Sequence, residues 1–82
     1  MDSDAVTYDQ ESDILYVRLR ELPIAATDTT DDLRLIDYSE DRAVVGVEFL
    51  QVGSGIDLSD LRDRHEIERL IDKSGLAIRI IA

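Results

Sequence analysis

Alternating apolar and polar positions predict a β-hairpin at the start of the chain. Residues 14–20 place apolar side chains at every second position, which is the period of a strand. A short β-prone segment, residues 6–8, precedes them, and the polar interval Asp-Gln-Glu-Ser-Asp separates the two. The second strand has Leu15, Val17 and Leu19 on one face, and Ile14, Tyr16 and Arg18 on the other. Because the second face is also partly apolar, we expect this strand inside the sheet.

A second hairpin is predicted in the middle of the chain. Two β-prone runs, residues 33–38 and 43–52, lie on either side of the polar turn Ser-Glu-Asp-Arg. We expect Val45, Val47 and Phe49 to share one face of the second run.

The connection between the two hairpins, residues 21–32, contains Pro23, which lacks a backbone N–H and interrupts regular pairing. We expect an irregular connection here, with an edge strand around residues 24–27. Its acidic cluster, Asp28, Asp31 and Asp32, is predicted to be an exposed loop or a docking surface for arginines.

The last third of the chain predicts one helix. Asp63 and Glu66 have the spacing of a capping box, in which each side chain binds a free backbone N–H of the first turn. Gly75 suits a left-handed helix end. We therefore predict a helix over about residues 63–73 and a last strand over residues 76–82. The apolar residues at helical spacing are Ile67, Leu70 and Ile71.

These elements predict a single α+β domain over residues 1–82, with a mostly antiparallel sheet of four or five strands and one helix on one face. The helix should pack against Val45, Val47 and Phe49 or their opposite-face neighbours. A domain of this size buries only ~60% of its unfolded surface. The other face would be apolar if it gathered Ile14, Tyr16, Ile36 and Tyr38. A second copy could cover such a face, so we expect a homodimer.

Charge changes the expected partners. The chain has 82 residues, of which 19 are acidic and 9 are basic, for a net charge of −10. This charge disfavours nucleic-acid binding and favours a basic protein partner. The chain contains no cysteine, so disulfides and thiolate metal sites are excluded. Without a membrane-spanning stretch or a signal-like N-terminus, it is expected to be cytoplasmic, and no cofactor is expected.

The acidic triplet Asp9, Glu11 and Asp13 lies in the first hairpin. An EF-hand loop that began at Asp9 would need glycine at its sixth position and glutamate at its twelfth, where this chain has Ile14 and Arg20. We expect a turn instead, in which Asp9 binds backbone two residues on, Glu11 is solvated and Asp13 ends the turn. A single contact with a divalent ion is the alternative.

Other candidate residues are spread along the chain. Convergence of Asp13, Asp37 and Glu48 would make a general acid/base pair or an ion site, whereas Glu48 pairing with Arg18 or Arg34 is the simpler alternative. The three tyrosines could line a groove, or they could pack between strands. The only histidine is expected to face solvent. These tyrosines and this histidine are Tyr8, Tyr16, Tyr38 and His65.

Three ordered motifs stand out along the chain: Tyr8, Asp9, Glu11, Asp13, Leu15 and Tyr16, then Ile36, Asp37 and Tyr38, then Val45, Gly46 and Glu48. Together they resemble a small prokaryotic family catalogued as domain of unknown function 2283. The resemblance covers residues 6–52, and residues 57–82 are similar to its longer members. It implies a small α+β domain with an antiparallel sheet, and it supplies no catalytic residues. Short members look as though they are sometimes encoded beside small toxin-like proteins.

The sequence therefore favours a non-enzymatic protein-interaction module that neutralises a basic partner. The alternative hypothesis is a small metal-dependent hydrolase with a carboxylate site of Asp13, Asp37 and Glu48 at a dimer interface.

Overall fold

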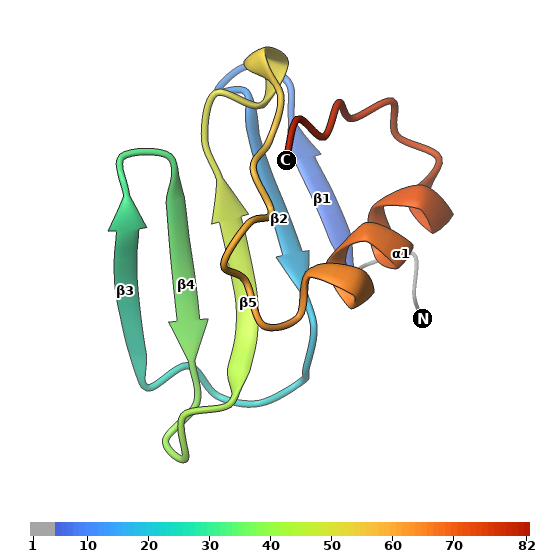
Figure 1. Ribbon diagram of the computed structural model, residues 1–82. Coiled ribbons are helices and arrows are strands. Elements are labelled where there is room, and N and C mark those ends of the chain that lie inside the picture. The colour runs from blue at the N-terminus through green and yellow to red at the C-terminus, as the bar shows by residue number, and fades with distance from the viewer. Residues whose placement is uncertain (1–4) are drawn as a thin grey trace.

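A computed structural model describes residues 5–82 and shows a five-stranded antiparallel sheet with one α-helix against one face (Figure 1). The strand order is β1-β2-β5-β4-β3. The predicted α+β class and both predicted hairpins are confirmed. The elements are β1 Val6–Asp9, β2 Ile14–Arg18, β3 Ala26–Asp31, β4 Arg34–Tyr38, β5 Val44–Phe49, a 3-10 turn η2 Val52–Ser54 and α1 Arg64–Ser74.

β5 is the central strand of the sheet and the most buried one. All of its residues except Glu48 are buried. It pairs with β2 on one side and with β4 on the other, so the two hairpins share it as a common centre. The long apolar run is thus buried between two neighbouring strands, while α1 covers one face of the sheet (Figure 1).

A β-bulge changes the faces of β5. Tyr38 pairs with Val44 and Asp37 pairs with Gly46, so Val45 is an extra residue opposite β4. The prediction that Val45 shares a face with Val47 and Phe49 is therefore wrong. Val44 joins the helix-side core in its place, and Val45 is buried outside that cluster.

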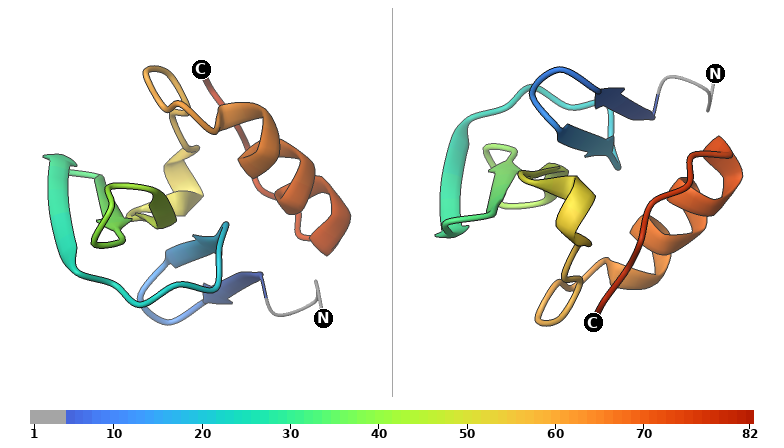
Figure 2. Two further views of the ribbon diagram at one scale, coloured as in Figure 1. Left: turned by 90° about the horizontal axis from the view of Figure 1, so that it is seen from below. Right: turned by 90° about the horizontal axis from the view of Figure 1, so that it is seen from above.

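The core lies between one face of the sheet and the C-terminal third of the chain. Figure 2 shows α1 beside β1 and β2, while β3 lies at the far end of the sheet. The predicted packing of the helix on the face of Val47 and Phe49 is confirmed, because these residues belong to one buried cluster. That cluster also contains Ile67, Leu70 and Ile71 from α1, and Ile56, Leu58 and Leu61 from the segment before it.

The N-terminal end of α1 differs from the prediction, whereas its C-terminal end agrees with it. The Asp63 side chain makes no hydrogen bond to the helix N-terminus, so the predicted capping box is wrong. Its carboxylate lies 3.8 Å from Arg20 instead, while the Glu66 side chain binds Arg69. At the other end Gly75 adopts φ 80 and donates its N–H to the Asp72 carbonyl, as the glycine there predicts.

The segment after the helix, residues 76–82, is not a strand of the sheet, so that prediction is wrong. It makes one parallel bridge, between Ile80 and Ile56. The carbonyls of Arg79 and Ala82 accept from the N–H groups of Ile56 and Leu58, at 2.8 and 3.0 Å. Because these bonds satisfy its backbone away from the sheet, alternation of apolar residues does not make it a sheet strand here.

Strand β3 occupies the edge beside β4. An edge strand is present here, as predicted, but it spans Ala26–Asp31 instead of residues 24–27, and so takes in much of the acidic segment predicted as a loop. Backbone pairing overrides the polar composition of Ala-Thr-Asp-Thr-Thr-Asp. All six residues are exposed.

The sheet face opposite α1 is not the apolar surface that was predicted. Ile14 and Tyr16 lie on it, but Ile36 and Tyr38 face the helix side, where Ile36 is in the core and Tyr38 packs against it. The reason is register, because alternate residues of β4 face opposite sides of the sheet. The homodimer remains a prediction. A monomeric mass measured by light scattering at high micromolar concentration would contradict it.

Candidate functional site

The turn of the first hairpin is built by Asp9. Its carboxylate accepts the Glu11 backbone N–H at 3.1 Å, which is the predicted turn. Glu11 is exposed at the tip, as expected. Asp13 adopts φ 59 as the chain enters β2. The first two acidic residues of the motif therefore lie where local backbone geometry explains them.

Asp13 joins the hairpin to a distant part of the chain. One carboxylate oxygen accepts the Tyr8 hydroxyl at 2.6 Å, and the other accepts the Gly53 N–H at 2.8 Å. The Tyr8 hydroxyl, followed by the Gly53 N–H, lowers the pKa of Asp13. The same hydrogen bond raises the pKa of Tyr8. Asp13 thus fastens the turn between β1 and β2 to the 3-10 turn after β5.

Asp37 is the centre of a second network, on the open face of the sheet. Its two oxygens accept the Tyr16 hydroxyl at 2.9 Å and the Thr27 hydroxyl at 2.6 Å. Burial and the Asp37 carboxylate raise the pKa of Tyr16 to about 12. Tyr16 reaches across β5 at Gly46, where an added Cβ would lie 2.2 Å from the phenol oxygen. The network links β2, β4 and β3 over the glycine of β5.

Glu48 lies on the same open face, where the register places it opposite Tyr16 on β2 and Leu35 on β4. The predicted ion pairs of Glu48 are wrong. Arg34 points to the helix side, and no ion pair within residues 5–82 joins Glu48 to Arg18.

The acidic residues predicted to converge do not meet within one protomer. Asp13 lies in the hairpin turn, whereas Asp37 and Glu48 lie on the open face. Within the described part of the chain, no three His, Asp or Glu side chains are grouped closely enough to hold a metal ion. A hydrolase site shared between two copies stays a prediction.

The three tyrosines do not line one groove. Tyr8 binds Asp13 and Tyr16 binds Asp37, while Tyr38 lies on the helix side with the Arg42 guanidinium 4.2 Å from its ring centre. His65 is exposed on α1, as expected. The tyrosines therefore serve three separate polar contacts.

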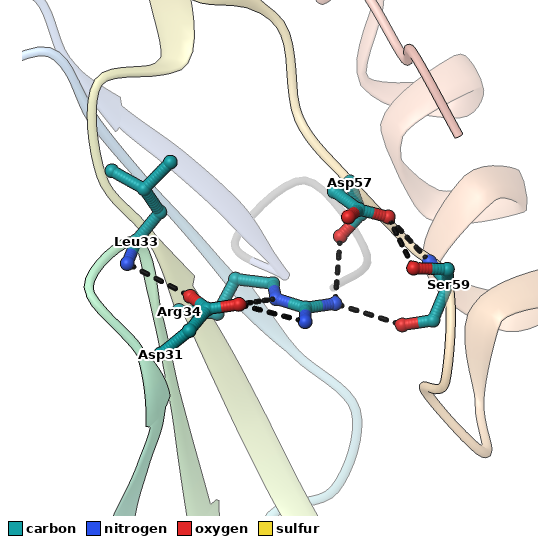
Figure 3. A network of polar contacts seen from close by, with 5 residues as sticks. All are labelled: Asp31, Leu33, Arg34, Asp57 and Ser59. Carbon is teal, nitrogen blue, oxygen red and sulfur yellow. Dashed lines mark hydrogen bonds and ion pairs between the residues drawn. The ribbon is translucent and has the colours of Figure 1, made fainter.

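Arg34 forms a network that the sequence analysis did not identify (Figure 3). The side chain is on the core face, and the residue is only 6% exposed. Its guanidinium donates to the Asp31 carboxylate at 2.8 and 3.1 Å, and to the carbonyls of Asp57 and Ser59 at 3.1 and 2.8 Å. It therefore ties the β3–β4 hairpin to the segment that leads into α1. One indication of this network was present in the sequence, because Arg34 lies two residues before the core residue Ile36 and so falls on the same face of the strand.

The Asp31 carboxylate completes this network. It also accepts the Leu33 N–H at 2.8 Å. That bond, and then the Arg34 guanidinium, lower the pKa of Asp31. The residue that begins the turn between β3 and β4 is thus held from both sides.

The longest exposed stretch in the described part of the chain runs from Arg20 to Leu33. We call the part that follows Arg20, residues Glu21–Leu33, the acidic edge. Every residue in it is exposed. It carries four carboxylates and no basic residue, together with three of the large apolar side chains that remain exposed. These are Glu21, Asp28, Asp31 and Asp32, and Leu22, Ile24 and Leu33.

An open hollow of about 540 Å³ adjoins the acidic edge. It lies between the connection before β3 and the turn between β4 and β5. Both apolar and acidic side chains surround it. The lining residues are Leu22, Pro23, Ala25, Ser39, Glu40 and Asp41.

Comparison with known proteins gives one result. The model of a family described as a protein of unknown function (DUF2283) matches residues 5–52, which is more than half of the chain. No match was found among curated proteins or among solved structures. Between residues 5 and 82, no helix has the length and apolar character needed to span a membrane.

Proposed function

The chain belongs to the DUF2283 family of proteins of unknown function, and from that premise we propose that it is a non-enzymatic interaction module. The proposed partner is a basic protein, which the module binds and neutralises through the acidic edge. The observation that carries this proposal is the exposed acidic edge, Glu21–Leu33, which has four carboxylates and no basic residue of its own. Exposed Arg20 precedes it, and Arg34 and Arg42 pair with Asp31 and Asp28.

The charge of the whole chain supports the same partner. A net charge of −10 attracts a basic protein from a distance and repels acidic ones, so it raises the rate of encounter and selects the partner. The exposed apolar residues Leu22 and Ile24 could then add short-range contacts. Apolar anchors with a polar surround are the usual arrangement of binding surfaces.

The motif carboxylates support binding rather than chemistry. Both oxygens of Asp13 and both oxygens of Asp37 accept hydrogen bonds from the protein itself. Such carboxylates hold the fold together, and a reacting group would have to displace an internal donor. Within the acidic edge, Asp31 is likewise held by the Leu33 N–H and by Arg34. The carboxylates of Glu21, Asp28 and Asp32 are exposed at the surface, where an arginine of a partner can reach them.

Binding of an arginine-rich peptide tests the proposal. One variant removes three negative charges from the acidic edge, and a matched variant removes three exposed negative charges elsewhere. The two variants therefore have the same net charge as each other. We expect about tenfold weaker binding for the first and little change for the second, with affinity falling as salt rises. The edge variant is Glu21→Gln, Asp28→Asn, Asp32→Asn, and the control is Asp60→Asn, Glu68→Gln, Asp72→Asn.

Fluorescence anisotropy of the labelled peptide gives the affinities, and circular dichroism shows whether both variants are folded. Equal weakening in the two variants would mean that net charge alone attracts the peptide, which contradicts a site at the acidic edge. Absence of binding to the unmodified protein would contradict the proposal as a whole.

A further inference from the structure

We propose that the partner binds as an added strand on the free edge of β3, through an extended segment that carries basic side chains. This inference rests on the proposed function and adds how the partner is held. It concerns the backbone of β3 as much as its charges. β3 is the last strand of the sheet on its side, and each of its residues is exposed.

The pairing pattern shows which backbone groups of β3 face outward. The Leu50 N–H donates to the Leu33 carbonyl, so residue 33 turns its backbone toward β5. Backbone groups alternate along an antiparallel strand, so Ile36 and Tyr38 turn theirs toward β3, where they pair with Asp28 and Ala26. A bond from the Ala25 N–H to the Tyr38 carbonyl agrees with this assignment.

It follows that Thr27 and Thr29 direct their backbone N–H and C=O groups away from the sheet. An extended peptide can pair with these groups as a sixth strand, which is a common mode of peptide recognition. α1 and the segment after it lie toward β1, at the opposite side of the sheet, so neither covers this edge (Figures 1 and 2).

The local sequence limits where the added strand can sit. Pro23 precedes β3, and a bulge between Thr29 and Asp31 ends the regular register. Proline and bulges are devices that restrict pairing at sheet edges. The regular window is therefore Ala26–Thr29, which is short, so affinity must also come from side chains.

The side chains beside this window select a basic segment. Asp28 and Asp31 belong to the face that also holds Tyr38 and Arg34, and Asp28 forms an exposed ion pair with Arg42 at 3.3 Å. Exposed pairs of this kind contribute little, so a partner's arginine can replace Arg42 at Asp28. Because side chains alternate along a strand, the segment should carry basic residues at alternate positions.

A second copy of this chain fits the edge less well. Pairing of β3 with β3 would bring the aspartates of two acidic edges together, and like charges opposite one another destabilise a sheet. Charge complementarity therefore favours a basic segment as the occupant.

Backbone methylation of a peptide tests strand addition directly. The probe is a short peptide that alternates arginine with valine and threonine. Two further peptides have the same sequence but carry N-methyl groups on one or the other set of alternate residues. An added strand uses the N–H groups of only one set, so we expect one methylated peptide to bind about tenfold more weakly and the other to bind normally.

A variant of the protein tests the backbone hydrogen bond that β3 itself would donate to the added strand. Thr29→Pro removes an outward N–H and keeps the bonds to β4, while Thr29→Val keeps the N–H and is the control. We expect weaker peptide binding only for Thr29→Pro. In the unmodified protein, amide exchange at Thr27 and Thr29 should slow when peptide is added. A Thr29→Pro variant that failed to fold would leave the methylated peptides and the exchange measurement to decide.

The outcomes separate the two proposals. Equal binding of all three peptides, weakened by the edge variant described above, would overturn strand addition and keep the acidic binding surface. If the edge variant bound the peptide as well as the unmodified protein does, both the acidic binding surface and strand addition would be overturned. A dimer of the free protein that Thr29→Pro converts to monomer would assign this edge to a second copy and overturn the proposal.

Discussion

The two edge strands of the sheet are held in different ways. β1 places Val6 in the core beside α1, and the Ala5 carbonyl next to it accepts the Arg18 N–H. β3 has no buried residue, and besides its backbone pairing with β4 it is held by polar side chains, through Thr27 and Asp31. One edge is part of the hydrophobic core, and the other is a surface feature.

This difference teaches where the molecule can change its contacts without unfolding. Segments with few buried apolar contacts open at lower free energy than segments in the core. β3 can therefore exchange its exposed contacts for those of a partner while the other four strands and α1 remain packed. An equivalent change at β1 would disturb the core around Val6.

The largest expected effect comes from the core next to β1. Leu15→Ala removes a side chain of 0% exposure from β2, and we expect a loss of about 3 kcal/mol in the free energy of unfolding. Thr30→Ala on β3 should change it by less than about 0.5 kcal/mol. Urea unfolding followed by circular dichroism measures both. Similar losses in the two variants would remove the contrast between the core next to β1 and the exposed strand β3.

A smaller but substantial effect is expected at the buried anchor of β3. Arg34→Met leaves the carbonyls of Asp57 and Ser59 without a donor, and we expect a loss of about 2 to 3 kcal/mol. The control Arg42→Met, with a side chain 61% exposed, should cost less than about 1 kcal/mol. The same unfolding assay applies. Equal costs would show that burial of Arg34 does not stabilise this edge.

Gly46→Ala tests the network on the open face that reaches β3. The added methyl would overlap the Tyr16 ring and approach the Val17 carbonyl, so we expect a loss of about 1 to 2 kcal/mol. The same substitution in a Tyr16→Ala background should cost less, because the ring is gone. An identical cost in both backgrounds would mean that Tyr16 does not determine the need for glycine.

The smallest effect is expected in acid, and it involves one carboxylate from each side of the sheet. The pKa values of Asp13 and Asp31 are lowered in the folded protein. Each contributes stability above its unfolded pKa, and that stability is lost as pH falls through the lower folded pKa. We expect Asp13→Asn and Asp31→Asn each to flatten the fall of stability below about pH 4. Urea midpoints measured from neutral to acidic pH check this, and unchanged curves would contradict it.

Local pattern was enough to predict the two hairpins, because their alternation spans whole strands. It was also enough for the Asp9 turn and for the Gly75 helix end, whose partners lie within a few residues. The position of Val45 was not predictable in this way. A bulge inserts one residue into an apolar run, and the composition on either side gives no sign of it.

Contacts between distant residues explain the other failures. Asp13 meets Gly53, and Tyr16 meets Asp37, only because the sheet brings separate strands together. Residues 76–82 alternate like a strand but pair outside the sheet, with the segment around Ile56. The exposure of β3 also depends on its place in the strand order, which a single sequence does not reveal.

The helix-side core also shows that the region recognised by sequence is not the unit that folds. The family match ends at residue 52, yet Ile56, Leu58, Leu61, Ile67, Leu70 and Ile71 all lie beyond it and cover the sheet. A fragment that ended at residue 52 would expose the apolar, helix-side face of β2 and β5 to water. In this chain, the C-terminal third thus covers the apolar face of the sheet. A shorter chain without these residues would need apolar side chains from another molecule to cover that face.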